Sequence, residues 1–357
     1  MLKFGRNSPT PPHPSCSIFR SFSHRHHQHI SLAWNDDDKS APPTMSSFLF
    51  WLSSSATVLT LLIHALNFLG RQFNMPILEF YGRSIASFVA LFICATYGTI
   101  ASALLSLVGY GGLGQWTTAR AFKWTMLLFT GVWFDVQDEK DVLGTTRPAV
   151  FVGNHQTELD VLVLGHIFPR YCSVTAKASL KWWPFLGWFM ALSKTVFIER
   201  KSRAQAFAAF DDAAKQMQSA KQSVYIFPEG TRSYYEHPDL LQFKKGAFHL
   251  AIQAQVPIVP VVVANYSNVL NVKRKRFRSG VIPVKVLDAI STKGKTKEDV
   301  DAILEETREK MLKELKALHE QVQKQGVAVN KQEAGQGHST ATQNGKATER
   351  KVMNAAA

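Results

Sequence analysis

The fold class follows from one stretch, PAVFVGNHQTELDVLVLGHI, at residues 148–167. Its first part, residues 148–152, is a short apolar run rich in valine, which is typical of a buried strand. Its last part, residues 159–167, is long and apolar enough for a helix, and polar residues lie between the two. Strands that alternate with helices predict an α/β fold, with a mixed or largely parallel sheet flanked by helices.

The rest of the chain continues this alternation as far as a polar end. Further strands are expected at 172–176, 223–227, 258–263 and 282–286, and helices at 204–217, 247–254 and from residue 296. The last helix carries an apolar stripe that favours packing on its own domain over coiled-coil pairing, at Val300, Ile303, Met311, Leu315, Leu318 and Val322. We therefore expect one catalytic domain over residues 110–325. Residues 326–357, rich in Gln, Ala, Gly and Thr, are expected to be a disordered tail.

Two long apolar segments precede this domain, at residues 47–69 and 84–109. Neither contains Lys, Arg, Asp or Glu, and each is long enough for a hydrocarbon core of about 30 Å. We expect two membrane helices over 47–109, which either span singly or form a re-entrant hairpin. For the second segment, a buried helix of a soluble domain is the alternative. Residues 1–44, rich in Ser, Pro and His, are expected to be a disordered extension or a targeting segment.

Two shorter apolar stretches, residues 122–134 and 182–192, suit a membrane interface. Both are too short to cross a bilayer. The second contains Trp182, Trp183 and Trp188, which are typical of side chains at the level of lipid head groups. A core helix under the sheet is the alternative for this second stretch.

The formal net charge of +14 favours an anionic partner, either nucleic acid or an anionic membrane. The two apolar segments favour membrane lipids, so no nucleic-acid partner is predicted. The three cysteines, at 16, 94 and 172, lack the spacing of a metal site or a disulfide framework. No metal site is predicted.

The polar linker within residues 148–167 has the residues for general-base catalysis. His155 follows the expected strand, and Asp160 lies five residues further on, near the start of the expected helix. Free imidazole has a pKa of about 6.5, which suits it to accept a proton from an alcohol near neutral pH. The Asp160 carboxylate could hold one ring nitrogen and fix the tautomer, as in a catalytic triad without the serine.

A second stretch, FPEGTRS at residues 227–233, has the residues for binding a phosphate ester. Gly230 would let backbone N–H groups approach an anion closely, and Arg232 could hold two phosphate oxygens. Glu229 is expected to orient Arg232 or the acceptor hydroxyl, and Thr231 belongs to the same substrate-binding turn. The alternative is a strand-to-loop turn with a Glu–Arg salt bridge on the surface.

The two motifs together resemble the N-H-x-x-x-x-D and F-P-E-G-T-R-S boxes of the glycerolipid acyltransferase family. Three further blocks resemble the same family, in particular its fungal 1-acyl-glycerol-3-phosphate acyltransferases: FIER at 197–200, FKKGAF at 243–248 and VPIVPV at 256–261. The resemblance covers about residues 48–318. It implies substrate-binding roles for Arg200 and Lys177. Lys194 stands where the family commonly has Gly.

This resemblance implies transfer of an acyl group from acyl-CoA to the sn-2 hydroxyl of lysophosphatidic acid, which gives phosphatidic acid. It implies no cofactor beyond the co-substrate acyl-CoA. The expected location is the endoplasmic reticulum membrane with a cytosolic catalytic face, or a lipid droplet. Glycerol-3-phosphate or a lysophospholipid is the alternative acceptor. Alternatives from other classes are an acyl-thioester hydrolase and a non-catalytic membrane-remodelling protein, although the chain has no G-x-S-x-G elbow for a covalent hydrolase.

Overall fold

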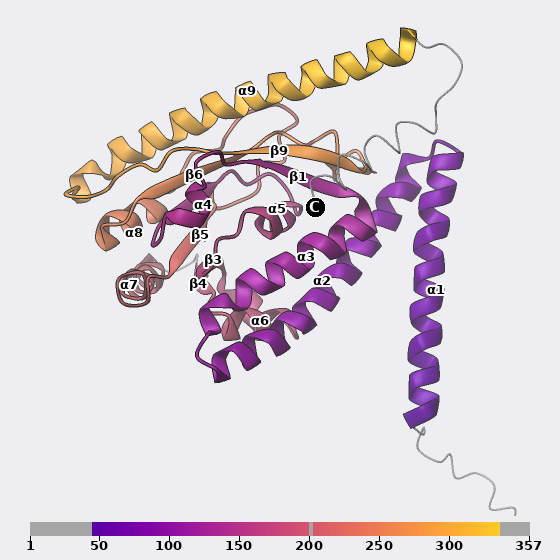
Figure 1. Cartoon of the computed structure of the whole chain (residues 1–357), viewed down its shortest axis with the longest axis horizontal. Helices are drawn as coiled ribbons and strands as arrows, with labels where there is room; N and C mark the ends of the chain where they lie inside the picture. The colour runs from indigo at the N-terminus through magenta and orange to yellow at the C-terminus, as the bar shows by residue number, and fades with distance from the viewer. Residues whose placement is uncertain (1–44, 200–202, 336–357) are drawn as a thin grey trace, which may run out of the picture. The chain divides into compact units, whose positions relative to one another are not determined.

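The computed structural model describes residues 45–199 and 203–335, in two compact units. The first unit, residues 1–54, is described only from the start of helix α1 (Met45–Gln72). The second unit, residues 55–357, holds the rest of α1 and every other described element (Figure 1). Residues 1–44, expected to be a disordered extension or a targeting segment, and residues 336–357, most of the expected tail, lie outside the described residues.

A seven-stranded sheet in the order β1-β9-β6-β2-β5-β3-β4 forms the centre of the second unit. Strands β2 to β6 are all parallel, whereas β9 pairs antiparallel with β6 and parallel with β1. The sheet is mixed and largely parallel, which confirms the prediction. Its strands are β1 (Val132–Gln137), β2 (Val150–Gly153), β3 (Cys172–Lys177), β4 (Val196–Ile198), β5 (Ser223–Ile226), β6 (Ile258–Val263) and β9 (Gly280–Val286). A separate hairpin pairs β7 (Leu270–Asn271) with β8 (Arg276–Phe277).

Helices cover both faces of the sheet. α5 (Asp160–Ile167) connects β2 to β3 in one direction across the sheet, whereas α7 (Arg203–Ala220) and α8 (Gly246–Ala254) connect strands in the opposite direction. Right-handed crossovers therefore place α5 on one face and α7 and α8 on the other. α3 (Gly114–Thr130) packs on α5, and α9 (Val300–Gly335) packs on α8 and β6, so α3 and α9 lie on opposite sides of the strands in Figure 1.

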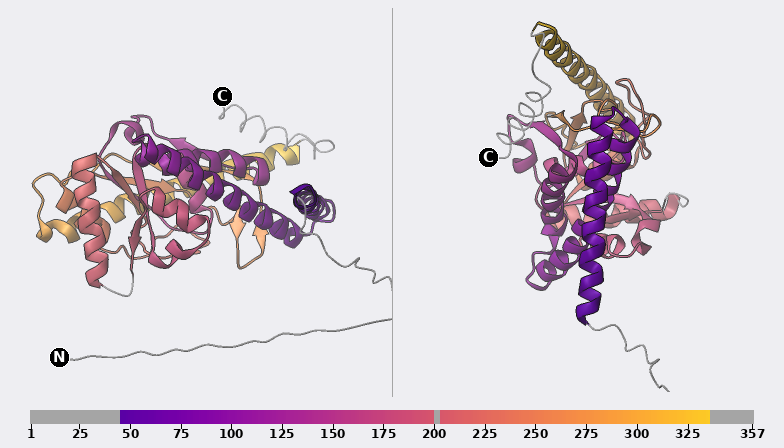
Figure 2. Two further views of the ribbon diagram at one scale, coloured as in Figure 1. Left: turned by 90° about the horizontal axis from the view of Figure 1, so that it is seen from below. Right: turned by 90° about the vertical axis from the view of Figure 1, so that its right-hand side faces the viewer.

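Of the remaining helices, only α2 (Pro76–Leu107) is long. The short ones are α4 (Val142–Thr145), α6 (Leu186–Leu192) and the 3₁₀ turns η1 (Gly111–Leu113), η2 (Ala178–Trp182) and η3 (Lys297–Asp299). α2 and α3 lie side by side (Figure 2), and α6 packs on α2. A Cβ at Gly98 of α2 would lie 2.6 Å from the Thr118 hydroxyl on α3 and 2.7 Å from the Phe189 ring on α6. Only glycine therefore lets these three helices approach so closely.

Both predicted membrane segments are helical. Residues 53–72 of α1 and the whole of α2 are long and apolar enough to cross a membrane, which indicates a membrane protein. α2 begins at Pro76, eight residues before the predicted start. The prediction used only the uncharged run, whereas the first turns of the helix also contain the charged residues Glu79 and Arg83. Proline suits such a position, since its fixed φ matches the first turn of a helix.

Two predicted boundaries differ from the structure. The apolar run 122–134 is not one interfacial segment, because Gly131 ends α3 with a φ of +66° and β1 follows it directly. Val132, Trp133 and Phe134 are buried, since β1 pairs with β9 in the sheet. The final helix, α9, continues to Gly335 and so passes the expected boundary at residue 325. Its apolar stripe packs on β6, β9 and α8, as predicted.

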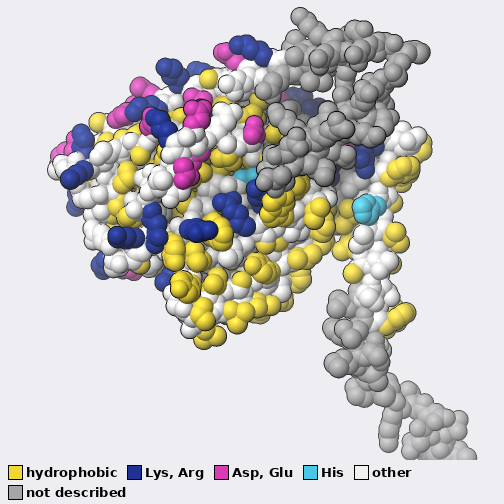
Figure 3. Space-filling model, in the orientation of Figure 1, with side chains coloured by type: hydrophobic (Ala, Val, Ile, Leu, Met, Phe, Trp, Pro, Cys, Tyr) yellow, Lys and Arg dark blue, Asp and Glu magenta, His cyan; other side chains and the backbone are white. Residues whose placement is uncertain are grey.

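The aromatic stretch 182–192 is exposed and interrupted. Trp182 ends η2, and α6 begins only at Leu186. The exposed fractions of Trp182, Trp183 and Trp188 are 83%, 59% and 54%, which excludes a core helix under the sheet. Figure 3 shows hydrophobic side chains gathered on the lower part of the face turned toward the viewer, over α2, α3 and α6. Lys and Arg side chains lie directly above them. Contact of this aromatic stretch with a membrane stays a prediction.

Candidate active site

The two sequence motifs meet at one edge of the sheet. The first follows β2, and the second follows β5, the parallel neighbour of β2, with Val152 opposite Ile226. Because the carboxyl ends of parallel strands lie at the same edge, the loops 154–159 and 227–233 are brought together. Open α/β sheets bind their ligands at this edge.

His155 and Asp160 form a hydrogen-bonded pair at this edge. The distance from His155 Nδ1 to Asp160 Oδ2 is 2.6 Å. Asp160 is the first residue of α5, and its side chain is 1% exposed. The His155 side chain is 18% exposed. The imidazole stacks on Phe227, with 4.2 Å between ring centroids and 19° between ring planes. The ring is thus held from its edge and from one face.

The hydrogen bonds of Asp160 fix the tautomer of His155. Asp160 Oδ2 also accepts from the backbone N–H groups of Gln156 (2.6 Å) and Thr157 (3.2 Å). A carboxylate oxygen that accepts from two amides is an acceptor toward the imidazole as well, so Nδ1 carries a proton. The second ring nitrogen, Nε2, is therefore the basic one. It has no hydrogen-bond partner within residues 45–199 and 203–335.

Tyr266, which the sequence did not single out, completes this arrangement. Its hydroxyl donates to Asp160 Oδ1 at 2.6 Å and lies 3.0 Å from the Thr157 hydroxyl. Burial, and then the charge of Asp160, hold the pKa of Tyr266 well above its usual range, so the tyrosine keeps the proton that it donates. Both Asp160 oxygens are accordingly engaged.

Asn154 and Gln156 attach the first motif to β6. The Asn154 side chain donates to the Val263 carbonyl (3.0 Å) and accepts from the Val263 N–H (2.9 Å). Gln156 Nε2 donates to the carbonyls of Val263 (3.1 Å) and Ala264 (3.0 Å). These buried amides position His155 through the backbone.

Glu229 ties the second motif to the first. Its carboxyl accepts from the backbone N–H of His155 (2.7 Å) and of Leu241 (2.9 Å), and in the described residues it forms no hydrogen bond or ion pair with Arg232. A role in orienting the acceptor hydroxyl stays a prediction. Glu229 is 2% exposed, and this burial raises its pKa to about 7. The Ser233 N–H also donates to the His155 carbonyl at 2.9 Å. Glu229 is therefore a buried tether under the catalytic loop.

Arg232 lies at the surface of the site. Its Nη1 donates to Glu158 Oε1 at 2.8 Å and to the Tyr234 hydroxyl at 3.1 Å, and that hydroxyl donates to the same Glu158 oxygen at 2.7 Å. The exposed fractions of Arg232 and Glu158 are 41% and 47%. The salt bridge of the alternative interpretation therefore exists, but with Glu158 as the acid. The other guanidinium N–H groups of Arg232 have no partner in the described part of the chain.

Lys244 lies over the Gly230 turn. Gly230 has a φ of +70°, and a Cβ there would lie 2.9–3.0 Å from the Lys244 side chain, including Nζ at 3.0 Å. The backbone N–H of Lys244 donates to the Pro228 carbonyl at 2.8 Å, which holds this lysine against the turn. Gly230 thus makes room for a cation next to Thr231, as well as for the turn itself.

The other two predicted substrate-binding residues are placed less fully. Lys177 is exposed at the last position of β3, and Val174 of this strand lies opposite Tyr225, so Lys177 is at the same edge as the second motif. Arg200 lies outside the described residues, directly after the described part of its block, Phe197–Glu199.

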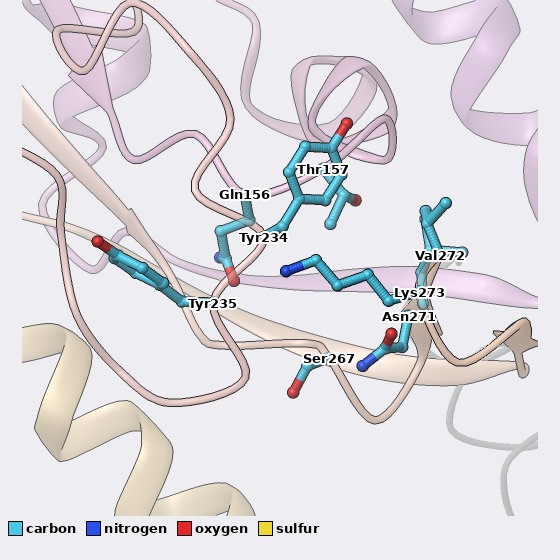
Figure 4. A pocket seen from close by; sticks show the side chains of 9 residues that line it. Gln156, Thr157, Tyr234, Tyr235, Ser267, Asn271, Val272 and Lys273 are labelled. Carbon is cyan, nitrogen blue, oxygen red and sulfur yellow. The ribbon is translucent and has the colours of Figure 1, made fainter.

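A narrow pocket adjoins the first motif. Gln156 and Thr157 line one side, Tyr234 another, and Lys273 of the β7–β8 hairpin extends toward Gln156 and Tyr234 (Figure 4). The pocket places a further lysine beside the His155 loop.

The fold and the site define an α/β enzyme whose His–Asp pair can act as a general base. Residues 134–264 match the family model described as Acyltransferase. The chain is 44% identical to the 1-acyl-sn-glycerol-3-phosphate acyltransferase of Saccharomyces cerevisiae, over 67% of this chain and 78% of that protein. It is 40% identical to the human 1-acyl-sn-glycerol-3-phosphate acyltransferase beta, over 64% of this chain and 80% of the human protein. The chain belongs to the 1-acyl-sn-glycerol-3-phosphate acyltransferase family.

A crystal structure of the 1-acyl-sn-glycerophosphate acyltransferase PlsC of Thermotoga maritima is also similar. It is 22% identical, with a TM-score of 0.47, and the match covers 66% of this chain and 98% of that one.

Proposed function

We propose that the protein transfers an acyl group from acyl-CoA to the sn-2 hydroxyl of lysophosphatidic acid, forming phosphatidic acid. The observation that carries this proposal is the 2.6 Å bond between His155 Nδ1 and Asp160 Oδ2, which leaves Nε2 as a base beside a turn with cations. The names of the relatives support lysophosphatidic acid as acceptor.

In the proposed reaction, His155 Nε2 accepts the proton of the acceptor hydroxyl as its oxygen attacks the thioester carbonyl carbon. The C–O bond forms, the C–S bond breaks, and the imidazolium returns the proton to the departing thiolate of CoA. Asp160 stabilises the imidazolium, because its carboxylate lies against Nδ1. A base in this position accelerates the reaction typically by 10²–10⁴. No cofactor takes part beyond the co-substrate acyl-CoA.

The acceptor phosphate would bind Arg232 and Lys244, with Lys177 at the same edge. A guanidinium group holds two phosphate oxygens in a planar fork, and the N–H groups of Arg232 that have no partner in the described residues are available for this. Thr231 and Gly230 would approach the phosphate through their backbone. We propose a location in the endoplasmic reticulum membrane, or on a lipid droplet, with membrane lipids around α2 and α6.

Product analysis tests this function. Purified full-length protein is supplied with radiolabelled acyl-CoA and, in turn, lysophosphatidic acid, glycerol-3-phosphate, a lysophospholipid without a phosphate monoester, or no acceptor. We expect label in phosphatidic acid and fastest turnover with lysophosphatidic acid. Equal release of free fatty acid in every reaction would identify a hydrolase, and faster transfer to another acceptor would overturn the choice of substrate.

A further inference from the structure

A second basic site lies at the opposite edge of the sheet from His155. It is a cavity of about 600 Å³ whose lining includes Trp116, Arg120, Arg147, Arg170 and Tyr171. Arg147 precedes β2, whereas His155 follows it. The four-residue strand β2 lies between them and rises about 3.3 Å per residue, so it alone separates the two ends by about 10 Å. The cavity is therefore separate from the catalytic site.

The arginines in this cavity are held in place by aromatic rings and carbonyl groups. The Arg147 guanidinium lies 4.0 Å from the centroid of the Tyr171 ring, and its Nε donates to the Lys221 carbonyl at 2.8 Å. Arg170 and Arg120 lie 5.0 Å and 5.8 Å from the centroid of Trp116. Arg120 also donates to the carbonyls at the end of α5, so it is fixed from both sides.

These guanidinium groups have no carboxylate partner. Across the two described ranges, 45–199 and 203–335, none of the three lies within 4.0 Å of an acid. Asp138 and Asp141 also line the cavity, but both Asp138 oxygens accept from backbone N–H groups at the start of α4, at 2.8 and 2.9 Å. Burial, and then the charge of Arg170, lower the pKa of Arg120. The lining thus carries three guanidinium groups and two carboxylates, and none of these guanidinium groups forms an ion pair with an acid in the described residues.

We propose that this cavity binds the phosphate group of an anionic ligand. Guanidinium groups pair with phosphate oxygens through charge-assisted hydrogen bonds, and the volume lies within the range of small-molecule sites. Trp116 and Tyr171 lie against the three arginines and line the same cavity.

The same chemistry fits an anionic lipid head group or a soluble phosphate ester. A lipid head group would reach the cavity along α3, which contributes Trp116 and Arg120 to the lining and carries exposed apolar side chains further on. Four residues after Arg120 comes Trp124, 41% exposed, and then Leu128, 81% exposed, on neighbouring turns of the same helix. In Figure 3, Lys and Arg side chains border the hydrophobic region over α2 and α3.

Binding measurements on the full chain in neutral detergent test the proposal. The probes are a radiolabelled short-chain diacylglycerol phosphate and inorganic phosphate. The test variant is Arg147→Gln/Arg170→Gln, and Arg120 is kept because it supports α5. The matched control, Lys215→Gln/Lys310→Gln, removes two exposed charges from α7 and α9. Arg170→Gln alone serves as the milder variant if the pair reduces folding, since no hydrogen bond of Arg170 is found in the described residues.

We expect the unaltered protein to show two classes of lipid site. In the test variant, the lipid affinity of one class should fall about tenfold or more, while its rate of acyl transfer stays unchanged. The control variant should keep both the lipid affinities and the rate of the unaltered protein. Loss of lipid binding alone identifies a head group as the ligand, and loss of both probes identifies a soluble phosphate. Hydrogen exchange at residues 168–172 should slow when the effective probe is added. Binding of both probes by the test variant as in the unaltered protein, or equal loss in the control, would overturn the proposal.

Discussion

The two motif loops flank the same site, yet they are held in opposite ways. In residues 154–160, the side chains of Asn154, Gln156 and Asp160 are between 1% and 6% exposed. Each of them is bonded to β6 or to the loop itself. In residues 227–233, Glu229 is buried in the same manner, but Arg232 is 41% exposed and keeps donors free.

This difference separates positioning from substrate binding. A buried polar group with fixed partners sets the geometry of its neighbours, and its loss changes the chemical step or the stability of the fold. An exposed cation with free donors is positioned to bind an anion, and its loss weakens substrate binding first. Substitutions in the first loop should therefore lower kcat, and substitutions of Arg232 should raise KM.

The largest effect is expected for Asp160→Asn. An amide at this position keeps one acceptor oxygen for the backbone N–H groups of Gln156 and Thr157, but it removes the negative charge that stabilises the protonated imidazole. We expect kcat to fall by about 10² or more, with KM little changed. Steady-state kinetics with both substrates varied measure this. A variant that keeps its kcat and loses only affinity for substrate would erase the proposed difference between the loops.

A smaller effect on the other kinetic parameter is expected for Arg232→Ala. The loss of a charge-assisted contact with phosphate should raise KM for lysophosphatidic acid by about tenfold or more, and KM for acyl-CoA much less. Glu158→Gln is the matched control, since it removes the internal partner of Arg232 and keeps the guanidinium. We expect it to leave that KM unchanged or lower. Equal increases for both substrates in Arg232→Ala would indicate a structural arginine.

Tyr266→Phe sharpens the comparison with a change of one oxygen atom. It removes the donor to Asp160 Oδ1 and leaves the Oδ2 bond to His155 in place. We expect kcat to fall by about tenfold, less than in Asp160→Asn, because a hydrogen bond to a charged carboxylate contributes about 1.5–3 kcal/mol and the carboxylate itself stays in place. The ratio of the two kcat values is the measurement. A loss as large as that of Asp160→Asn would mean that Tyr266 acts directly in the reaction.

Glu229 predicts a pH dependence of stability. Its pKa is raised from 4.5 to about 7 in the folded chain, so its contribution to stability is complete below about pH 4.5 and is lost as the pH rises toward 7. The loss amounts to about 3 kcal/mol at most. The melting temperature of the protein should therefore fall relative to that of Glu229→Gln as the pH rises over this range, because only the carboxyl ionises. A constant difference between the two would show that the carboxyl is ionised throughout.

Sequence patterns located five of the seven strands of the sheet, and also the central pair. Valine-rich runs located β2, β5 and β6, and the five-residue spacing brought His155 and Asp160 together, because a strand end and a helix start are adjacent in the chain. β1 was missed, since its apolar residues continue those of α3 and only the conformation of Gly131 separates them.

Long-range contacts explain what else was missed. Tyr266 reaches Asp160 across 106 residues of sequence, and no local pattern links them. Glu229 was expected to orient Arg232 or the acceptor hydroxyl, but Glu229 is buried under the His155 loop, and Arg232 pairs with the accessible acid Glu158. Lys244 lies over Gly230 because its backbone is bonded to Pro228, which spacing does not reveal.

The central claim is that His155 Nε2 is the base for acyl transfer. Its most direct test is the single-turnover rate of phosphatidic acid formation by His155→Ala, with both substrates saturating and the melting temperature measured in parallel. We predict a rate at least about 10² lower than that of the unaltered protein, at a similar melting temperature. A rate within tenfold of the unaltered protein would contradict the account.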